Sequence, residues 1–137
     1  MRIIGLDVGT KTVGIAISDA MGWTAQGVDT VRFRSEQYED AVQAVLAHIA
    51  TLKPERIVIG MPKNMDGSIG HAGERTQLFA ELLAQQSELP IVFWDERLSS
   101  IQAERMLLEA DLSRKKRKQV IDKMAAVVIL KSYLDSL

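Results

Sequence analysis

The sequence predicts an α/β fold: a mixed five-stranded sheet with helices on both faces. Short runs rich in Ile and Val alternate with longer segments in which apolar residues recur every three or four positions, and this gives the element order βββαβαβαα. The strand–helix–strand steps of the second half require right-handed crossovers and parallel strands. The short gaps between the first three strands favour an antiparallel meander.

The first third of the chain is predicted to form that meander. Apolar runs at 2–8 and 13–18 are separated by four residues that begin with Gly9, a gap that suits a hairpin. A third strand is expected over 27–33, after a loop around Gly22. These three strands would pair in chain order.

The rest of the chain alternates between helices and strands. Apolar residues spaced by three and four predict a helix between Tyr38 and Leu52, which ends before Pro54 because the residue preceding a proline avoids helical geometry. The elements expected after it are a strand at 57–59, a helix around 78–83, a strand at 91–94, a helix capped by Ser99 or Ser100, and a last helix from about 120 to 133.

Length and composition limit the class of protein. With 137 residues, 47% hydrophobic, the chain is expected to form a single domain over 1–137. The absence of cysteine excludes disulfides, thiolate metal sites and cysteine nucleophiles. Neither a signal peptide nor an apolar stretch of about 20 residues is present, so a cytoplasmic protein without membrane contact is expected. The net charge of −1 means that nucleic acid would have to bind a local basic patch.

Asp7 is the first candidate for a functional residue. It interrupts an apolar strand, where burial of a lone carboxylate would cost several kcal/mol. Gly5 and Gly9 lie two residues to either side and are expected to open space around it. The alternative is an aspartate that caps a turn at the end of the strand.

Asp95 and Glu96 are the next candidates. They follow the strand at 91–94 directly, and α/β sheets bind their ligands at the carboxyl ends of such strands. The alternative is a solvated loop in which one of these acids pairs with Arg97.

Asp122, in the last helix, is the third candidate. Ala125 and Ala126 lie on the same face, and small side chains would let the helix approach the sheet closely. The alternative is an exposed helical aspartate. If Asp7, Glu96 and Asp122 converge, their oxygens suit Mg²⁺ or Mn²⁺, and two such ions could activate a water and stabilise the leaving oxygen in phosphodiester hydrolysis.

Basic residues would supply phosphate contacts beside these acids. The run Arg114, Lys115, Lys116, Arg117 and Lys118 precedes Asp122, and Lys11, Lys63 and Arg97 are expected at the same rim. Such runs often form only a solvated face. Of the two histidines, His48 is expected to be structural, and His71 could act near the site.

Four motifs together are similar to a known family. They are 5–11 with 13–16 (GLDVGTK and VGIA), 60–67 (GMPKNMDG), 95–100 with 103–104 (DERLSS and AE), and 122–126 (DKMAA). In this order and spacing they resemble the YqgF (RuvX) family, whose members are described as Holliday-junction-resolvase-like proteins and pre-16S rRNA nucleases. The resemblance implies a ribonuclease H-like fold, a bacterial cytoplasmic location, and a role in maturing the 5′ end of small-subunit ribosomal RNA.

The resemblance also maps the acidic site onto Asp7, Glu96 and Asp122. Thr12 and Lys63 depart from residues common in the family, which is expected to alter substrate contacts at most. The strand at 57–59 ends without the acid that the wider resolvase superfamily places there. Glu96 or Asp66 must then supply the second ligand, with Asp95 as a further reserve.

Three alternatives stay open on the sequence alone. The segment 7–11 is also similar to the phosphate loop of actin-like sugar kinases, but those enzymes need two lobes and a second loop. A non-catalytic nucleic-acid-binding or protein-binding module is the stronger rival. RNA is preferred to branched DNA as the substrate only because of the family description, and the chain could act as a monomer or a homodimer.

Overall fold

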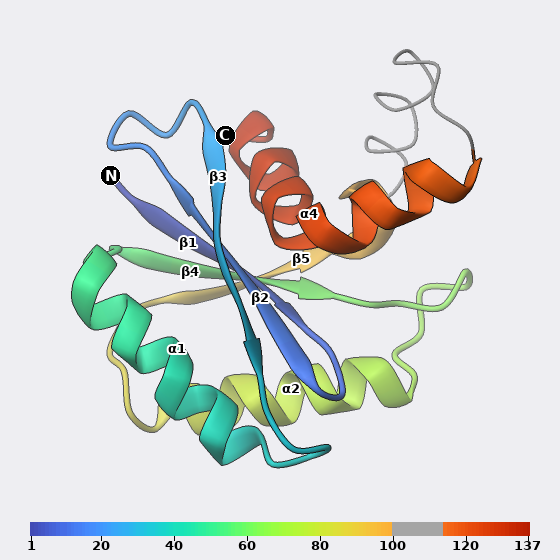
Figure 1. Cartoon of the computed structure of the whole chain (residues 1–137), viewed down its shortest axis with the longest axis horizontal. Helices are drawn as coiled ribbons and strands as arrows, with labels where there is room; N and C mark the ends of the chain where they lie inside the picture. The colour runs from blue at the N-terminus through green and yellow to red at the C-terminus, as the bar shows by residue number, and fades with distance from the viewer. Residues whose placement is uncertain (100–113) are drawn as a thin grey trace.

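A mixed five-stranded sheet forms the centre of the structure, a computed structural model that describes residues 1–99 and 114–137, with side chains from residue 124 in the second range (Figure 1). The strand order is β3-β2-β1-β4-β5. The elements are β1 (Ile3–Val8), β2 (Thr12–Ser18), β3 (Ala25–Arg32), α1 (Tyr38–Leu52), β4 (Arg56–Met61), α2 (His71–Ala84), β5 (Ile91–Asp95) and α4 (Arg114–Asp135).

The pairing of the strands confirms the predicted sheet. β2 pairs antiparallel with both β1 and β3, whereas β4 pairs parallel with both β1 and β5. The carboxyl ends of β1, β4 and β5 therefore lie at one edge of the sheet. That edge is the usual position for ligand sites in parallel α/β sheets.

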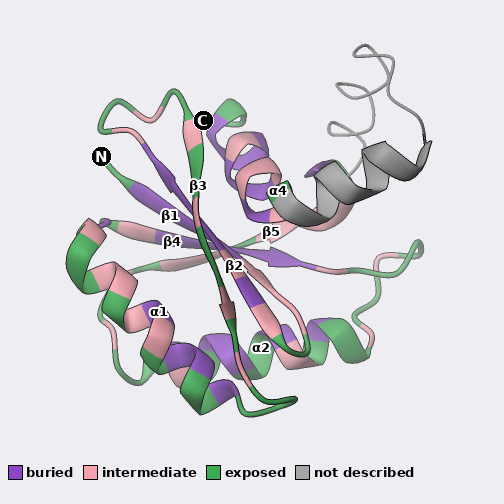
Figure 2. Ribbon diagram, viewed as in Figure 1, coloured by how far each residue is buried: buried purple, intermediate pink, exposed green. Residues whose placement is uncertain are grey.

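Helices cover both faces of the sheet, as predicted. α1 and α2 lie on one face and α4 crosses the other (Figure 1). The larger core lies under α1 and α2, where Leu6, Ile59 and Phe79 are fully buried. A smaller core joins Ile3 and Leu130 on the α4 face, and buried residues line both sides of the central strands (Figure 2).

α4 is held close to the sheet by a glycine and two hydrogen bonds. A Cβ atom at Gly5 would lie only 2.8 Å from the Cβ of Leu130, so this position must be glycine for the helix to pack where it does. The Arg56 guanidinium donates to the Tyr133 hydroxyl at 2.7 Å, and the Trp94 indole N–H donates to the Ser132 hydroxyl at 2.9 Å. The sequence suggested that Gly5 opens space around Asp7. It does not, because α4 fills the space beside Gly5.

Two helix boundaries differ from the prediction. The helix after β5 already begins at Glu96, and the Arg97 N–H donates to the Asp95 carboxylate at 3.0 Å, so Asp95 and not Ser99 caps it. Ser100 lies outside the described residues. α4 begins at Arg114, so the basic run belongs to the helix and does not precede it.

Other differences are small. β3 begins two residues earlier than expected, and α2 extends back to His71. Among the helices in the described ranges, none combines the length and the apolar composition that crossing a membrane requires.

Candidate active site

The structure brings Asp7 and Glu96 together at the carboxyl edge of the sheet. Asp7 is the next-to-last residue of β1 and lies on the α4 face, because alternate residues of a strand share a face and Ile3 and Gly5 both pack against that helix. Glu96 follows the last residue of β5. A side-chain hydrogen bond joins the two acids.

Two glycines make room for this pair. A Cβ at Gly60 would lie 2.5 Å from Cδ1 of Ile129 and 2.7 Å from Oε1 of Glu96, so these two side chains share the place of a missing side chain on β4. Gly14 lies opposite Asp7 in the β1–β2 pairing, and a Cβ there would be 3.7 Å from the Cβ of Asp7. β4, which ends without an acid, thus leaves room for Glu96, which follows the neighbouring strand β5.

The surroundings of Glu96 disfavour its charged form. Burial, the negative charge of Asp7, the hydrogen bond with Asp7 and the charge of Asp95 together raise the pKa of Glu96 to about 8. Both charged groups that shift this pKa in the described part of the chain are acids. The raised pKa therefore favours the protonated form of Glu96 at neutral pH, beside the oxygens of Asp7.

Asp122 belongs to α4. The Asp122 side chain is not among those that the structure describes, so its predicted role is supported only by its place in the helix. Ala126, one helical turn further on, lies 3.5 Å from where a Gly14 Cβ would be, beside Asp7. Among the side chains that the structure describes, no three acids or histidines are grouped closely enough to hold a metal, and the pair of Asp7 and Glu96 is what they provide.

Asp95 points into a different set of contacts. The Arg97 guanidinium donates to it through Nε at 3.1 Å and through Nη2 at 2.7 Å, and this hydrogen-bonded cation lowers the pKa of the Asp95 carboxyl. The ion pair that the sequence offered as an alternative is present. Arg97, predicted to bind phosphate, has two of its three guanidinium nitrogens on Asp95.

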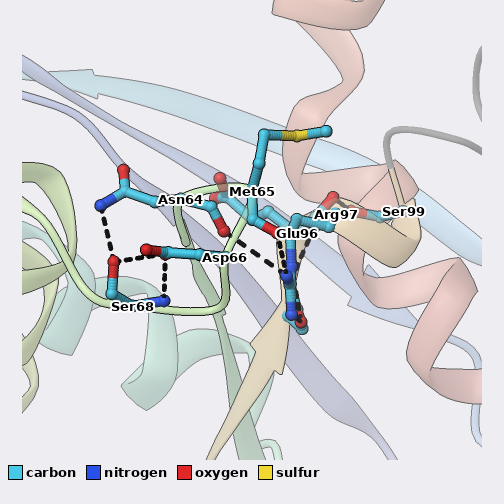
Figure 3. A network of polar contacts seen from close by, with 8 residues as sticks. Asn64, Met65, Asp66, Ser68, Glu96, Arg97 and Ser99 are labelled. Carbon is cyan, nitrogen blue, oxygen red and sulfur yellow. Dashed lines mark hydrogen bonds and ion pairs between the residues drawn. The ribbon is translucent and has the colours of Figure 1, made fainter.

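Asp66, the other reserve ligand, belongs to an exposed loop between β4 and α2. Its carboxylate accepts hydrogen bonds from the Ser68 N–H at 2.9 Å and the Ser68 hydroxyl at 2.6 Å, and the hydroxyl contact lowers the pKa of Asp66 (Figure 3). These contacts stabilise a turn. They do not connect Asp66 with the pair at the sheet edge.

Of the predicted basic residues, Lys63 and Lys11 are exposed. Lys63 is exposed and lines a cleft of about 600 Å³ that Glu96 also borders. Lys11 is exposed in the turn between β1 and β2, close in sequence to Asp7. The side chains of Arg114, Lys115, Lys116, Arg117 and Lys118 lie outside the described residues, on the first turns of α4.

Neither histidine joins the acid pair. His48 of α1 lies 3.1 Å from the Asp29 carboxylate of β3 and links a helix to the edge strand, in line with the predicted structural role. His71 is exposed at the start of α2, where its ring lies 3.7 Å from Glu74.

The glycines that shape the site, Gly60 and Gly14, were not predicted from the sequence. Gly60 and Gly14 interrupt strands that are otherwise rich in β-branched residues, and a glycine within a strand often marks a close approach by another group. That signal was available in the sequence. What it could not tell was which side chain would fill the space.

Comparison with known proteins supports a nuclease. The model of a family described as "RuvX: Holliday junction resolvase" matches residues 1–136. Relatives named "Putative pre-16S rRNA nuclease" are 56% identical in Geobacillus sp. (strain WCH70) and 57% identical in Bacillus thuringiensis (strain Al Hakam). Each alignment has 136 residues and covers 99% of both chains.

Solved structures show the same fold at low sequence identity. RuvC of T. thermophilus, in complex with a Holliday junction substrate, has a TM-score of 0.64 at 12% identity and covers 99% of this chain and 94% of that one. The fowlpox virus Holliday junction resolvase has a TM-score of 0.54 at 14% identity, with 100% of both chains covered. The predicted ribonuclease H-like fold, the one these resolvases share, is confirmed.

A third structure bears on the sugar-kinase alternative. The ROK hexokinase of Thermus thermophilus has a TM-score of 0.51 at 18% identity, but the match covers 76% of this chain and only 38% of the hexokinase. The likeness is to part of the kinase and concerns the fold alone. The family match over nearly the whole sequence, the full-length relatives and the resolvase fold agree with one another: the chain belongs to the RuvX family.

Proposed function

We propose that this chain is a metal-dependent endonuclease that hydrolyses phosphodiester bonds, and that its substrate is the 5′ region of precursor 16S ribosomal RNA. The observation that carries the proposal is the pairing of Asp7 with Glu96 over Gly60, at the edge of the sheet where α/β proteins bind ligands. The RNA part of the proposal follows the names of the full-length relatives.

The acid pair fits a divalent cation by its donor chemistry. Hard cations such as Mg²⁺ and Mn²⁺ take carboxylate oxygens, and among the residues that the structure describes the charged neighbours that raise the pKa of Glu96 are acids. Asp7 and Glu96 would hold the ion, with Asp122 as the proposed third ligand from α4. When bound, the ion supplies positive charge that favours the ionised carboxylates and stabilises negative charge developing on phosphate oxygens.

The rest of the chain would bind and orient the substrate. Lys63 at the cleft and Lys11 in the β1–β2 turn are exposed near the acids and can contact phosphates on either side of the scissile bond. The basic run at the start of α4 is proposed to extend this contact, because it belongs to the same helix as Asp122. A linear RNA requires one such site, whereas symmetrical cutting of a junction would require a two-fold dimer.

The test compares a precursor 16S rRNA fragment with a four-way DNA junction, each in Mn²⁺ and in EDTA. We expect faster cleavage of the RNA, loss of cleavage in EDTA, and a loss of more than about 100-fold in Asp7→Asn and in Asp122→Asn. Asp135→Asn is the matched control, because Asp135 lies at the far end of the same helix in an ion pair with Lys131.

The outcomes separate the alternatives. Cleavage of the junction alone would leave the nuclease standing and overturn the choice of RNA. If wild type and the acid variants bind RNA equally and none of them cleaves, the chain is a non-catalytic binding module.

A further inference from the structure

The cleft beside Glu96 has a lining that phosphodiester chemistry leaves unexplained. Hydrolysis of a phosphate ester needs oxygen ligands and positive charge, which the acids and lysines provide. The cleft is also lined by Pro62, Met65 and Leu98, and the side chains of Met65 and Leu98 are 95% and 53% exposed. Its volume of about 600 Å³ is within the range of small-molecule sites.

Arg97 fixes one wall of this cleft. While Nε and Nη2 hold Asp95, Nη1 donates to the backbone carbonyls of Asn64 and Met65 at 3.4 and 3.3 Å. A single guanidinium thus connects the residue before Glu96 to the loop that carries Met65 (Figure 3). Such a planar, multiply donating group can hold two segments in one relative position.

The loop is also fixed internally. The Asn64 N–H donates to the Ser68 carbonyl at 2.9 Å, and Gly67 adopts a φ of +88°, which a side chain would strain. Ile69 packs where Gly73 of α2 has no side chain, since a Cβ at Gly73 would lie 2.3 Å from Cγ2 of Ile69.

Met65 is presented by this ordered loop. Its side chain points away from the polar network and into solvent (Figure 3). Because this wall is already ordered, ligand binding does not have to order the loop and loses no conformational entropy there. An exposed apolar side chain on such a wall is suited to contact with a ligand.

We propose that the cleft binds one unpaired nucleobase of the substrate strand, beside the bond addressed by Asp7 and Glu96. Met65 and Leu98 would contact the face of the base, Lys63 the neighbouring phosphate, and Arg97 acts as a positioning residue for the wall. This inference rests on the proposed function and narrows its substrate: the nucleotide next to the cut must be unpaired.

The chemistry of the cleft favours a base over other occupants. The occupant lies directly beside Glu96, so it must be continuous with the strand being cut. Apolar side chains such as Met, Leu and Pro can contact the flat face of a base that has left its stack. Within a continuous duplex that face is covered by its neighbours, and only an unpaired or extruded nucleotide exposes it.

The first experiment moves one abasic nucleotide along a cleavable RNA and measures kcat/KM. For wild type, we expect one abasic position to lower kcat/KM by about tenfold, and Met65→Ala to lower it similarly on the intact RNA. For Met65→Ala, the same abasic position should cause little further loss. Met21→Ala is the matched control, because Met21 is a 68% exposed methionine in the β2–β3 loop. Additive losses, or an equal response to every abasic position, would overturn the proposal.

A binding experiment keeps this test separate from the nuclease itself. An RNA oligonucleotide containing 2-aminopurine is titrated in EDTA, where cleavage is not expected. A fluorescence change in wild type that disappears in Met65→Ala supports the base site even if no RNA is ever cleaved. The same change in both proteins overturns it.

The positioning role of Arg97 has a readout of its own. Trypsin is specific for lysine and arginine, so the exposed Lys63 is a possible cleavage site. We expect Arg97→Gln to increase cleavage after Lys63 about tenfold, with partial protection restored in Arg97→Lys. Arg2→Gln is the control, since Arg2 donates to the Leu52 carbonyl at 3.3 Å elsewhere on the surface. Unchanged resistance in Arg97→Gln would show that Arg97 does not hold the loop.

Discussion

The Glu96 carboxyl lies over the bare backbone of Gly60 and against the Asp7 side chain, where its charged form is disfavoured. The raised pKa of Glu96 should therefore make the stability of the metal-free protein depend on pH. Below its ordinary pKa of 4.5 the carboxyl is protonated in both the folded and the unfolded state. Between 4.5 and the folded value of about 8 only the unfolded state ionises, so the folded state loses stability as the pH rises.

Glu96→Gln removes that dependence. In EDTA we expect the variant to be more stable than wild type at pH 8 by about 1–3 kcal/mol, with the difference closing by pH 4.5. Cleavage should be lost at the same time. Urea denaturation across this pH range measures the free energy of unfolding of both proteins. If the two free energies change with pH in parallel, the pKa of Glu96 is not raised in the folded protein.

Individual residues show what the sequence can and cannot predict. Asp7 stood out because a lone carboxylate inside an apolar strand is costly to bury. Asp95 and Glu96 stood out because they follow a strand end, where α/β sheets bind their ligands. The contacts of Arg97 were harder to foresee. The sequence allowed both a phosphate contact and a pair with Asp95, and only the folded loop brings the Asn64 and Met65 carbonyls within reach of the guanidinium.

At the scale of elements, the seat of α4 on the sheet connects the fold to the site. Gly5→Ala would place a methyl group 2.8 Å from the Leu130 Cβ and 3.3 Å from the Ala126 carbonyl oxygen. The helix would have to move, and we expect the free energy of unfolding to fall by about 1–3 kcal/mol. Because α4 carries Asp122, cleavage should fall as well.

The matched control is Gly27→Ala, on β3 under the same helix. There a new Cβ would lie 3.6 Å from Cγ2 of Val127, an ordinary contact, and the change in stability should stay within about 0.5 kcal/mol. Chemical denaturation of both variants gives the comparison. Equal losses in the two would show that the close approach at Gly5 is not what seats the helix.

Element boundaries were the least predictable part of the fold. Hydrophobic periodicity located α1 well, because its apolar face packs against the sheet. The start of α4 was missed because five consecutive charged residues carry no apolar periodicity, although Arg and Lys are good helix formers. The helix after β5 begins four or five residues earlier than predicted, because Asp95 caps it while also pairing with Arg97.

For the whole molecule, the mixed sheet and its two helical faces could be predicted from strand order and crossover rules alone. The convergence of Asp7 from β1 with Glu96 at the end of β5 could be inferred only as a consequence of that topology. Glu96 can lie beside Asp7 because Gly60 has no side chain. Hydrophobic periodicity does not predict which side chain will lie over a glycine.

Asp7, Glu96 and Asp122, from distant parts of the chain, are proposed to hold a divalent cation together. The most direct test of this proposal is a calorimetric titration of the intact protein with Mn²⁺. We predict that Asp7→Asn, Glu96→Gln and Asp122→Asn each weaken binding by at least about tenfold, while Asp135→Asn leaves it unchanged. If wild type binds no Mn²⁺ at millimolar concentration, or if the three variants bind it as wild type does, these three acids do not form a metal site.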